Sequence, residues 1–218
     1  MPRNNVLVAA PTYAGKDYAL DDYIAAYNDF VWSDRSLLLV DNTRDHGEYA
    51  AHLHELGIPI VRRVEPSRDF EETLSRCWRV ILEEAQRGKW EWVMSLETDV
   101  IAPPLTMDTM LNAALYCGAP FVTHCYPYHD NRTGEYYQGL GCVLMTTPLL
   151  EKAFELHDDS NSPAHDIVEG AIYEVAKTNT HISFATLLPI KHRDAPGGGS
   201  VEGGWDWDEI TDPRVVKV

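Results

Sequence analysis

Trp92-Val93-Met94-Ser95-Leu96-Glu97-Thr98-Asp99 is the stretch that decides the fold. Four of its first five residues are apolar, which predicts a buried strand over Trp92–Leu96. This strand runs directly into two acids, Glu97 and Asp99. Because they stand two residues apart after an extended segment, their carboxylates can point to the same side of the chain. The stretch therefore indicates a strand that delivers a polar site at its carboxyl end.

Upstream of Trp92, short apolar runs alternate with helical patterns. We expect strands at Asn5–Ala10, Ser36–Val40 and Ile58–Val64, and helices at Asp17–Phe30, Glu48–Leu56 and Phe70–Arg87. Such alternation predicts an α/β fold: a three-layer α/β/α sandwich around a mainly parallel, Rossmann-like sheet with right-handed crossovers. Ligands of these sheets bind beyond the carboxyl ends of the strands. Asp41 stands at such an end, as Glu97 and Asp99 do.

Downstream of Asp99 the pattern is more mixed. We expect helices at Thr106–Tyr116, Leu149–Leu156 and Asp166–Ala176, and strands at Phe121–Tyr126, Gln138–Met145 and Ile182–Leu188. One catalytic domain is predicted over residues 1–194. Residues 195–218 form a glycine-rich tail that is a possible lid, with Trp205 and Trp207 able to close over a ligand; a plain disordered end is the alternative.

Composition narrows the class of protein. The 218 residues carry 18 basic and 34 acidic side chains, a net charge of −16, so a nucleic-acid partner is not indicated, although a local basic patch is not excluded. No apolar run is long enough for a membrane span or a signal peptide, and we expect a cytoplasmic protein. The four cysteines lack CxxC spacing and are expected to be reduced thiols.

Three segments, in chain order, resemble a known family: Val6–Tyr13, Leu37–Asn42 and Trp92–Asp99. They are similar to the first strand and its Pro-Thr-Tyr turn, the second strand with its terminal Asp, and the strand leading to the DxD motif of GT-A-fold glycosyltransferases. The layout is close to the family-2 group over the first half of the chain, and more loosely over most of the rest. The first acid of the motif is Glu97 here rather than Asp, whereas the last acid, Asp99, matches the motif. The resemblance therefore supports a metal-binding role more strongly for Asp99 than for Glu97.

The resemblance implies roles for individual residues. The residues expected to bind the nucleotide-sugar donor are Pro11, Thr12, Tyr13, Asp41, Glu97, Thr98, Lys191 and Arg193, with Asp41 at the uracil or ribose and the last two at the diphosphate. Those expected to hold a metal ion are Asp99, Glu97 and His192. Each group also has an interpretation without a binding role. Glu97 and Asp99 could be ordinary loop acids before Pro103, His192 a surface histidine, and Lys191 and Arg193 a solvated basic pair.

A divalent ion would suit the chemistry that the resemblance implies. A sugar nucleotide leaves as a diphosphate, so negative charge develops on its β-phosphate oxygen, and a cation there stabilises that charge. Mn²⁺ or Mg²⁺ prefers carboxylate oxygens to thiolates. The expected cofactors are therefore Mn²⁺ or Mg²⁺, with a UDP-sugar as the donor.

The acceptor side and the base are expected in the second half. Residues predicted to border the sugar and acceptor are Tyr137, Gln138, Gly139, Gly141 and Trp205, although a bulged strand explains the glycines equally well. Asp166 is the predicted general base, with Glu169 in reserve, since an inverting transferase needs a carboxylate for the proton of the acceptor hydroxyl. Asp166 could instead only cap a helix.

The sequence thus predicts a metal-dependent glycosyltransferase that moves a sugar from a nucleotide-diphosphate sugar to a hydroxyl acceptor with inversion. One alternative is a sugar nucleotidyltransferase, whose usual glycine-rich, basic loop is poorly matched by Pro11–Lys16 with its single Gly and single Lys. Another is a non-catalytic domain that only binds nucleotide sugars. Neither GxxxxGK[ST] nor GxGxxG occurs, which disfavours ATPases and dinucleotide enzymes.

Overall fold

The computed structural model describes residues 4–124, 128–130, 135–137, 140–158, 168–179, 181–185, 190–193 and 216–217. For the segments 128–130, 135–137, 181–185, 191–192 and 216–217 the description covers the backbone alone. All structural statements below refer to these residues.

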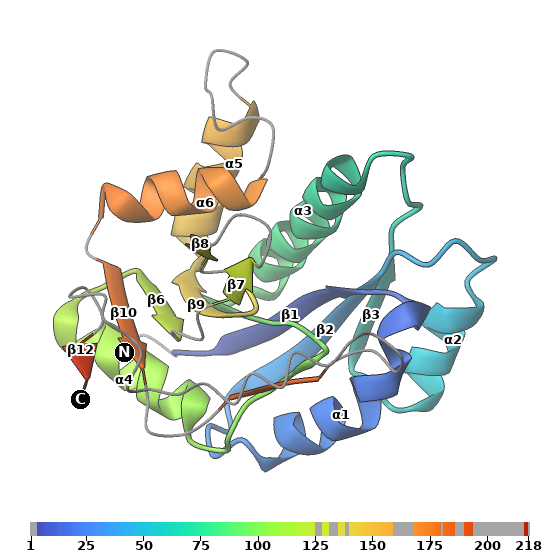
Figure 1. Ribbon diagram of the computed structural model, residues 1–218, viewed down its shortest axis with the longest axis horizontal. Coiled ribbons are helices and arrows are strands. Elements are labelled where there is room, and N and C mark those ends of the chain that lie inside the picture. Colours follow the sequence, from blue (N-terminus) through green and yellow to red (C-terminus); the bar gives the residue numbers. More distant parts are fainter. Residues whose placement is uncertain are drawn as a thin grey trace.

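A mixed sheet of eight strands forms the centre of the molecule (Figure 1). Its spatial order is β12 (Val216–Lys217), β10 (His181–Ala185), β6 (Phe121–His124), β9 (Cys142–Thr146), β4 (Trp92–Leu96), β1 (Val6–Thr12), β2 (Arg35–Asp41) and β3 (Ile60–Arg63). All neighbouring strands run parallel except β9, which is antiparallel to both β4 and β6. The expected mainly parallel sheet is confirmed.

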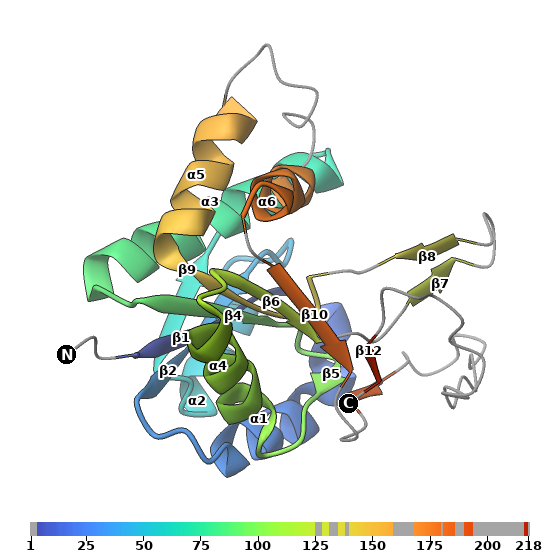
Figure 2. The ribbon, with the colours of Figure 1, turned by 90° about the vertical axis from the view of Figure 1, so that its left-hand side faces the viewer.

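Helices cover both faces of this sheet, as Figures 1 and 2 show. One face carries the 3-10 helix η1 (Ala14–Ala19), α1 (Leu20–Asp29), α2 (Glu48–Glu55) and α4 (Thr106–Cys117). The other carries α3 (Phe70–Gly88), α5 (Thr147–Asp158) and α6 (Val168–Lys177). The three-layer α/β/α sandwich predicted from the sequence is therefore confirmed.

Strand β1 shows why the sheet must be covered on both sides. Val6 and Val8 belong to the apolar core under α1, α2 and α4, whereas Leu7 and Ala9 belong to the core under α3, α5 and α6. A central parallel strand buries both of its faces, so it reads as a continuous apolar run rather than an alternating one. Burial against two helical layers holds β1 at the middle of the fold.

Two short pairs of strands lie outside the main sheet. β5 (Val100–Ile101) pairs with β11 (Lys191–His192), and β7 (Tyr128–Asp130) pairs with β8 (Glu135–Tyr137), both antiparallel. Two or three residues carry no period that sequence analysis can detect, and none of these strands was expected as such. The strand predicted over Gln138–Met145 is wrong at its start, because Leu140 and Gly141 form a turn before β9.

Most expected helices agree with the structure, with shifts at their ends. The helix predicted over Asp17–Phe30 is interrupted: Ala14–Ala19 is a tighter 3-10 helix, and α1 begins only at Leu20. Within the described residues, the helix predicted from Asp166 begins at Val168. In the described part of the chain, no helix is both long and apolar enough to cross a membrane.

Candidate functional site

The carboxyl ends of β1, β2 and β4 meet at one edge of the sheet. β1 pairs with β2 on one side and with β4 on the other, although β2 and β3 both come before β4 in the chain. The strand order therefore reverses at β1. In open α/β sheets the crevice at such a reversal is where ligands bind, and the sequence-predicted residues Thr12, Asp41 and Glu97–Asp99 all lie at this edge.

Thr12 and Thr98 join the two strands that flank this reversal. Their hydroxyl oxygens lie 3.2 Å apart, and both residues are buried. Pro11, just before Thr12, is half-buried in β1. The side chains of Thr12 and Thr98 thus form part of the floor of the site rather than its rim.

Asp41 ends β2 directly beside Thr12, which is its partner in the strand register. Its carboxylate is fully buried, and Oδ1 accepts a hydrogen bond of 2.8 Å from the Thr43 backbone N–H. Among the described residues, Oδ2 has no hydrogen-bond partner. A buried carboxylate oxygen without a donor is costly, so it suggests a place for a ligand N–H or O–H.

The Glu97-Thr98-Asp99 turn is held by three backbone hydrogen bonds. Glu97 N–H donates to the carbonyl of Gly141, and Val100 N–H donates to the Glu97 carbonyl, at 3.0 and 2.9 Å. Arg193 N–H donates to the Asp99 carbonyl at 2.7 Å, next to the β5–β11 pair. Gly141, predicted at the acceptor side, therefore does lie against the acid turn.

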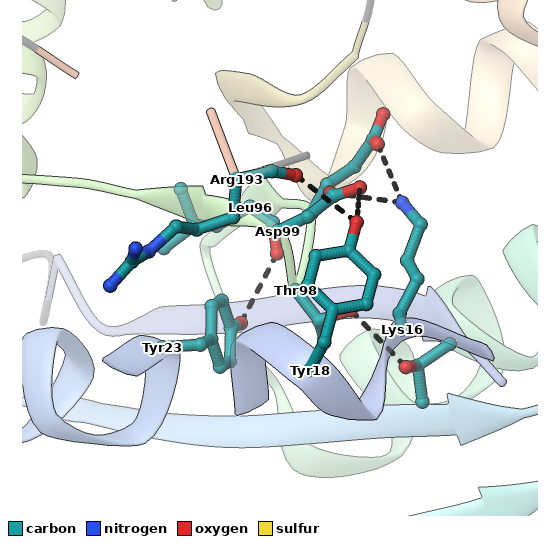
Figure 3. A network of polar contacts seen from close by, with 9 residues as sticks. Lys16, Tyr18, Tyr23, Leu96, Thr98, Asp99 and Arg193 are labelled. Atoms are coloured by element: carbon teal, nitrogen blue, oxygen red, sulfur yellow. Dashed lines mark hydrogen bonds and ion pairs between the residues drawn. The ribbon is translucent and has the colours of Figure 1, made fainter. Parts of the chain in front are cut away.

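A lysine stands between the two acids. Lys16 Nζ lies 3.0 Å from Glu97 Oε2 and 2.9 Å from Asp99 Oδ1. Figure 3 shows the Lys16 side chain pointing toward Asp99. Burial acts to lower the Lys16 pKa, but the charges of Glu97 and Asp99 outweigh it, so the pKa is raised above its usual value. Lys16 is therefore a permanent cation at neutral pH.

The acid pair does not fit a divalent ion while Lys16 holds this position. One oxygen of each carboxylate, Glu97 Oε2 and Asp99 Oδ1, already accepts from the ammonium, and the Tyr18 hydroxyl lies 3.5 Å from the other oxygen of Asp99. Among side chains that the structure describes, no group of three His, Cys, Asp or Glu residues could hold a metal ion. The predicted metal role of Glu97, Asp99 and His192 stays a prediction.

The segment 190–193 runs beside the acid turn. His192 pairs with Val100, and Lys191 pairs with Ile101, so the late segment predicted to approach the metal motif does lie next to it. The side chains of Lys191 and His192 lie outside the description. Their predicted roles in binding stay predictions.

The side chain of Arg193, at the end of this segment, is described. Its exposed guanidinium contacts Asp22, and in Figure 3 it points away from Lys16 and Asp99. The backbone carbonyl of Arg193 accepts a hydrogen bond of 3.1 Å from the Tyr18 hydroxyl. In this arrangement Arg193 acts through its backbone, and its predicted contact with the diphosphate would require the side chain to leave Asp22.

Glu169 lies in the first turn of α6 and is half-buried. Burial, followed by the negative charge of Glu97, raises the pKa of its carboxyl to about 7. Glu169 therefore lies close enough to the acid turn to feel its charge. A carboxylate that titrates near neutral pH suits proton transfer, because it can both accept and release a proton there.

Tyr13 follows β1 at the rim of the site and is 46% exposed. Its ring lies over Gly15, where an added Cβ would come 2.2 Å from Tyr13 Cε2. The missing side chain at Gly15 thus lets the chain turn closely under the ring and carry Lys16 toward the acids. Tyr13, predicted to help bind the donor, thus remains partly exposed at this rim.

Several predicted site residues lie outside the described part of the chain. These are Gln138, Gly139, Asp166, Trp205 and Trp207. For Tyr137 the description covers the backbone, which belongs to β8. In the predicted tail, Val216–Lys217 forms strand β12 beside β10, and the lid role of the rest stays a prediction.

Sequence analysis missed Lys16 and Tyr18 as members of the site. The sequence pattern places Lys16 only in a poor match to a nucleotidyltransferase loop, and Tyr18 only within the helix expected over Asp17–Phe30. The available signal was the Gly15-Lys16 pair shortly after the first strand.

A hollow of about 530 Å³ lined by Trp90, Trp92 and Thr147 lies at the opposite ends of the strands and contains no site residue.

The fold and this edge of the sheet define a class: a GT-A-type α/β sandwich. No protein-family model matches the chain, and no curated protein matches it. Among solved structures it resembles residues 1–349 of S. aureus TarS, a GT-A glycosyltransferase, with a TM-score of 0.56 and 11% identity. The match covers 82% of this chain and 57% of the TarS chain.

A second TarS structure, in complex with UDP-GlcNAc, matches with a TM-score of 0.58 and 12% identity, covering 89% of this chain and 60% of that one. The chain thus spans less than two thirds of the TarS structures it resembles. At such low identity the likeness concerns the fold. The GT-A fold that the sequence motifs indicate is confirmed.

Proposed function

We propose that the chain is a glycosyltransferase that moves a sugar from a UDP-sugar to an acceptor hydroxyl. The observation that carries the proposal is that the acid turn Glu97–Asp99 and the buried, unpartnered Oδ2 of Asp41 stand at the ends of the two strands that flank β1, at the strand reversal of a GT-A fold. The UDP-GlcNAc bound by TarS supports a UDP-sugar as the donor.

The nucleotide end of the donor is assigned to Asp41. Oδ2 of Asp41 can accept the N3–H of uracil or a ribose hydroxyl, which would satisfy a buried oxygen that has no donor among the described residues. Thr12 beside it and the exposed ring of Tyr13 border the same position. A ligand that donates a hydrogen bond to Oδ2 of Asp41 does not have to displace a donor of the described residues.

The diphosphate end is assigned to the acid turn. Carboxylates repel a diphosphate, so a cation must lie between the acids and the phosphates. The sequence predicts Mn²⁺ or Mg²⁺ for this purpose. Glu97 and Asp99 can bind such an ion only when Lys16 leaves them, since its ammonium holds the bridging oxygens.

The reaction breaks the bond between the anomeric carbon and the β-phosphate oxygen, and forms a bond from that carbon to the acceptor oxygen. The acceptor proton passes to a carboxylate, and UDP leaves with the bonding electrons. Glu169 is the described candidate for the base, and Asp166 is the first candidate from sequence. Inversion is part of the proposal: the acceptor oxygen attacks the anomeric carbon in one step from the face opposite the leaving diphosphate, while the carboxylate takes its proton.

Thermal-shift measurements with UDP-, GDP- and CMP-sugars test the nucleotide assignment, since a ligand that binds the folded chain raises its apparent stability. We expect the UDP-sugars to raise Tm most.

Asp41→Asn should weaken UDP binding at least about tenfold, or about 1.4 kcal/mol. The free variant should be as stable as the wild type or more so, because the costly unpartnered carboxylate is gone. The exposed Asp34→Asn is the control. Equal UDP affinity in Asp41→Asn would contradict the assignment.

The two alternatives give different results in the same preparation. A sugar nucleotidyltransferase would make the UDP-sugar from UTP and a sugar 1-phosphate and release pyrophosphate. A non-catalytic domain would bind UDP-sugars and leave them intact. A transferase releases UDP and transfers the sugar, so product analysis separates the three.

A further inference from the structure

We propose that Lys16 is the resident cation of the diphosphate position, where it competes with any divalent ion for Glu97 and Asp99 and itself contacts the donor phosphates. The inference rests on the proposed function for the identity of the ligand. The competition itself depends only on the geometry of Lys16 and the two acids.

The first argument is position. An ion that bridged Oε2 of Glu97 and Oδ1 of Asp99 would have to lie between these two oxygens, and Lys16 Nζ lies there, within 3.0 Å of both. Ammonium and divalent ion therefore claim the same oxygens. Because both are positive, they also repel each other strongly at this range.

The second argument is how firmly Lys16 is held there. The lysine reaches the acids from η1, directly after β1, and the two acids stand on a turn fixed by backbone hydrogen bonds. The Asp99 side chain is only 6% exposed, so solvent weakens its attraction to the ammonium little.

The third argument is that Lys16 can still serve a ligand. An ammonium has three N–H donors, and two of them are used by Glu97 and Asp99. Among the described residues, the Lys16 ammonium donates to Glu97 and Asp99, and the Lys16 side chain remains 20% exposed. The remaining donor and the positive charge suit a phosphate oxygen, for which lysine is a common partner.

The competition is tested by titrating Mn²⁺ alone into the whole chain and measuring free Mn²⁺ by electron paramagnetic resonance. We expect the wild type to bind weakly, with Kd near or above about 1 mM, and Lys16→Met to bind at least about tenfold more tightly. Lys16→Arg, which keeps the charge, should remain weak. Lys152→Met removes an exposed surface lysine of α5 and should behave as the wild type.

Two results would overturn the competition. One is micromolar Mn²⁺ binding by the wild type, which needs no variant to fold. The other is a folded Lys16→Met with unchanged Mn²⁺ affinity; Lys16→Gln replaces it if the methionine variant does not fold.

The phosphate contact is tested by UDP titration in EDTA. The wild type and Lys16→Arg should bind UDP without a divalent ion, Lys16→Met at least about tenfold more weakly, and added Mn²⁺ should restore binding to Lys16→Met. Equal UDP affinity of wild type and Lys16→Met in EDTA would refute the contact. Absence of UDP binding by the wild type with and without Mn²⁺ would instead refute the proposed function, and the Mn²⁺ titration would still decide the competition.

Discussion

The hydroxyls of Thr12 and Thr98 lie 3.2 Å apart in the buried floor of the site, where they connect the end of β1 to the acid turn after β4. Residues 86 positions apart in the chain are thus coupled at the strand reversal. This contact bears both on the stability of the fold and on the position of Asp99, one residue further on.

Thr98→Val should lower the free energy of unfolding by about 1–3 kcal/mol, because it leaves the buried Thr12 hydroxyl without its partner. The double variant Thr12→Val/Thr98→Val should lose less than the sum of the two single variants, since neither hydroxyl is then left unpaired. Urea denaturation of the four proteins measures this. Strictly additive losses would show that the two hydroxyls do not interact.

The rate of transfer should rise with pH through about 7, since the base must be deprotonated and the pKa of Glu169 is raised to about 7. Glu169→Gln should lower kcat by about 10²-fold or more and remove this titration. Glu174→Gln, on the exposed side of the same helix, is the matched control. If Glu169→Gln turns over normally and Asp166→Asn does not, the base is Asp166.

Glu169 should also make the fold less stable at high pH. Its pKa is about 7 in the folded chain, against an ordinary value of 4.5. The protonated carboxyl therefore stabilises the fold below its ordinary pKa, and this contribution is lost as the pH rises through 7. The Tm of Glu169→Gln relative to wild type should be higher at about pH 8 than at about pH 5. A Tm difference independent of pH would mean that Glu169 is not held in the buried setting described.

Much of the fold could be predicted from the sequence because it depends on long periodic segments. The apolar runs of β1, β2 and β4 are buried on both faces, and the helical spacing along Phe70–Arg87 matches α3 closely. The same logic located Asp41 and Glu97–Asp99, since a residue that directly follows a parallel strand must lie at the ligand edge.

The cation of the site could not be predicted in this way. Lys16 meets Glu97 across 81 residues of sequence, and the contact depends on the 3-10 helix η1, which begins at Ala14, before the helix expected from Asp17. Nor does the two-residue β5–β11 pair leave a pattern in the sequence, although it sets the position of Arg193. Contacts made by turns and very short strands are decided by tertiary packing rather than by local sequence.

The most direct test of the account is the release of UDP from UDP-sugars, followed by nuclear magnetic resonance of the phosphorus and anomeric proton signals. With water as the acceptor, the account predicts that the wild type slowly forms UDP and a free sugar whose anomeric configuration is inverted when it is first released, with Mn²⁺ or in EDTA. Asp99→Asn should form almost none, because it removes one of the two carboxylates that position Lys16. Asp108→Asn, in the first turn of α4, should match the wild type. Intact donor after prolonged incubation with the wild type, or equal UDP release by Asp99→Asn, would contradict it.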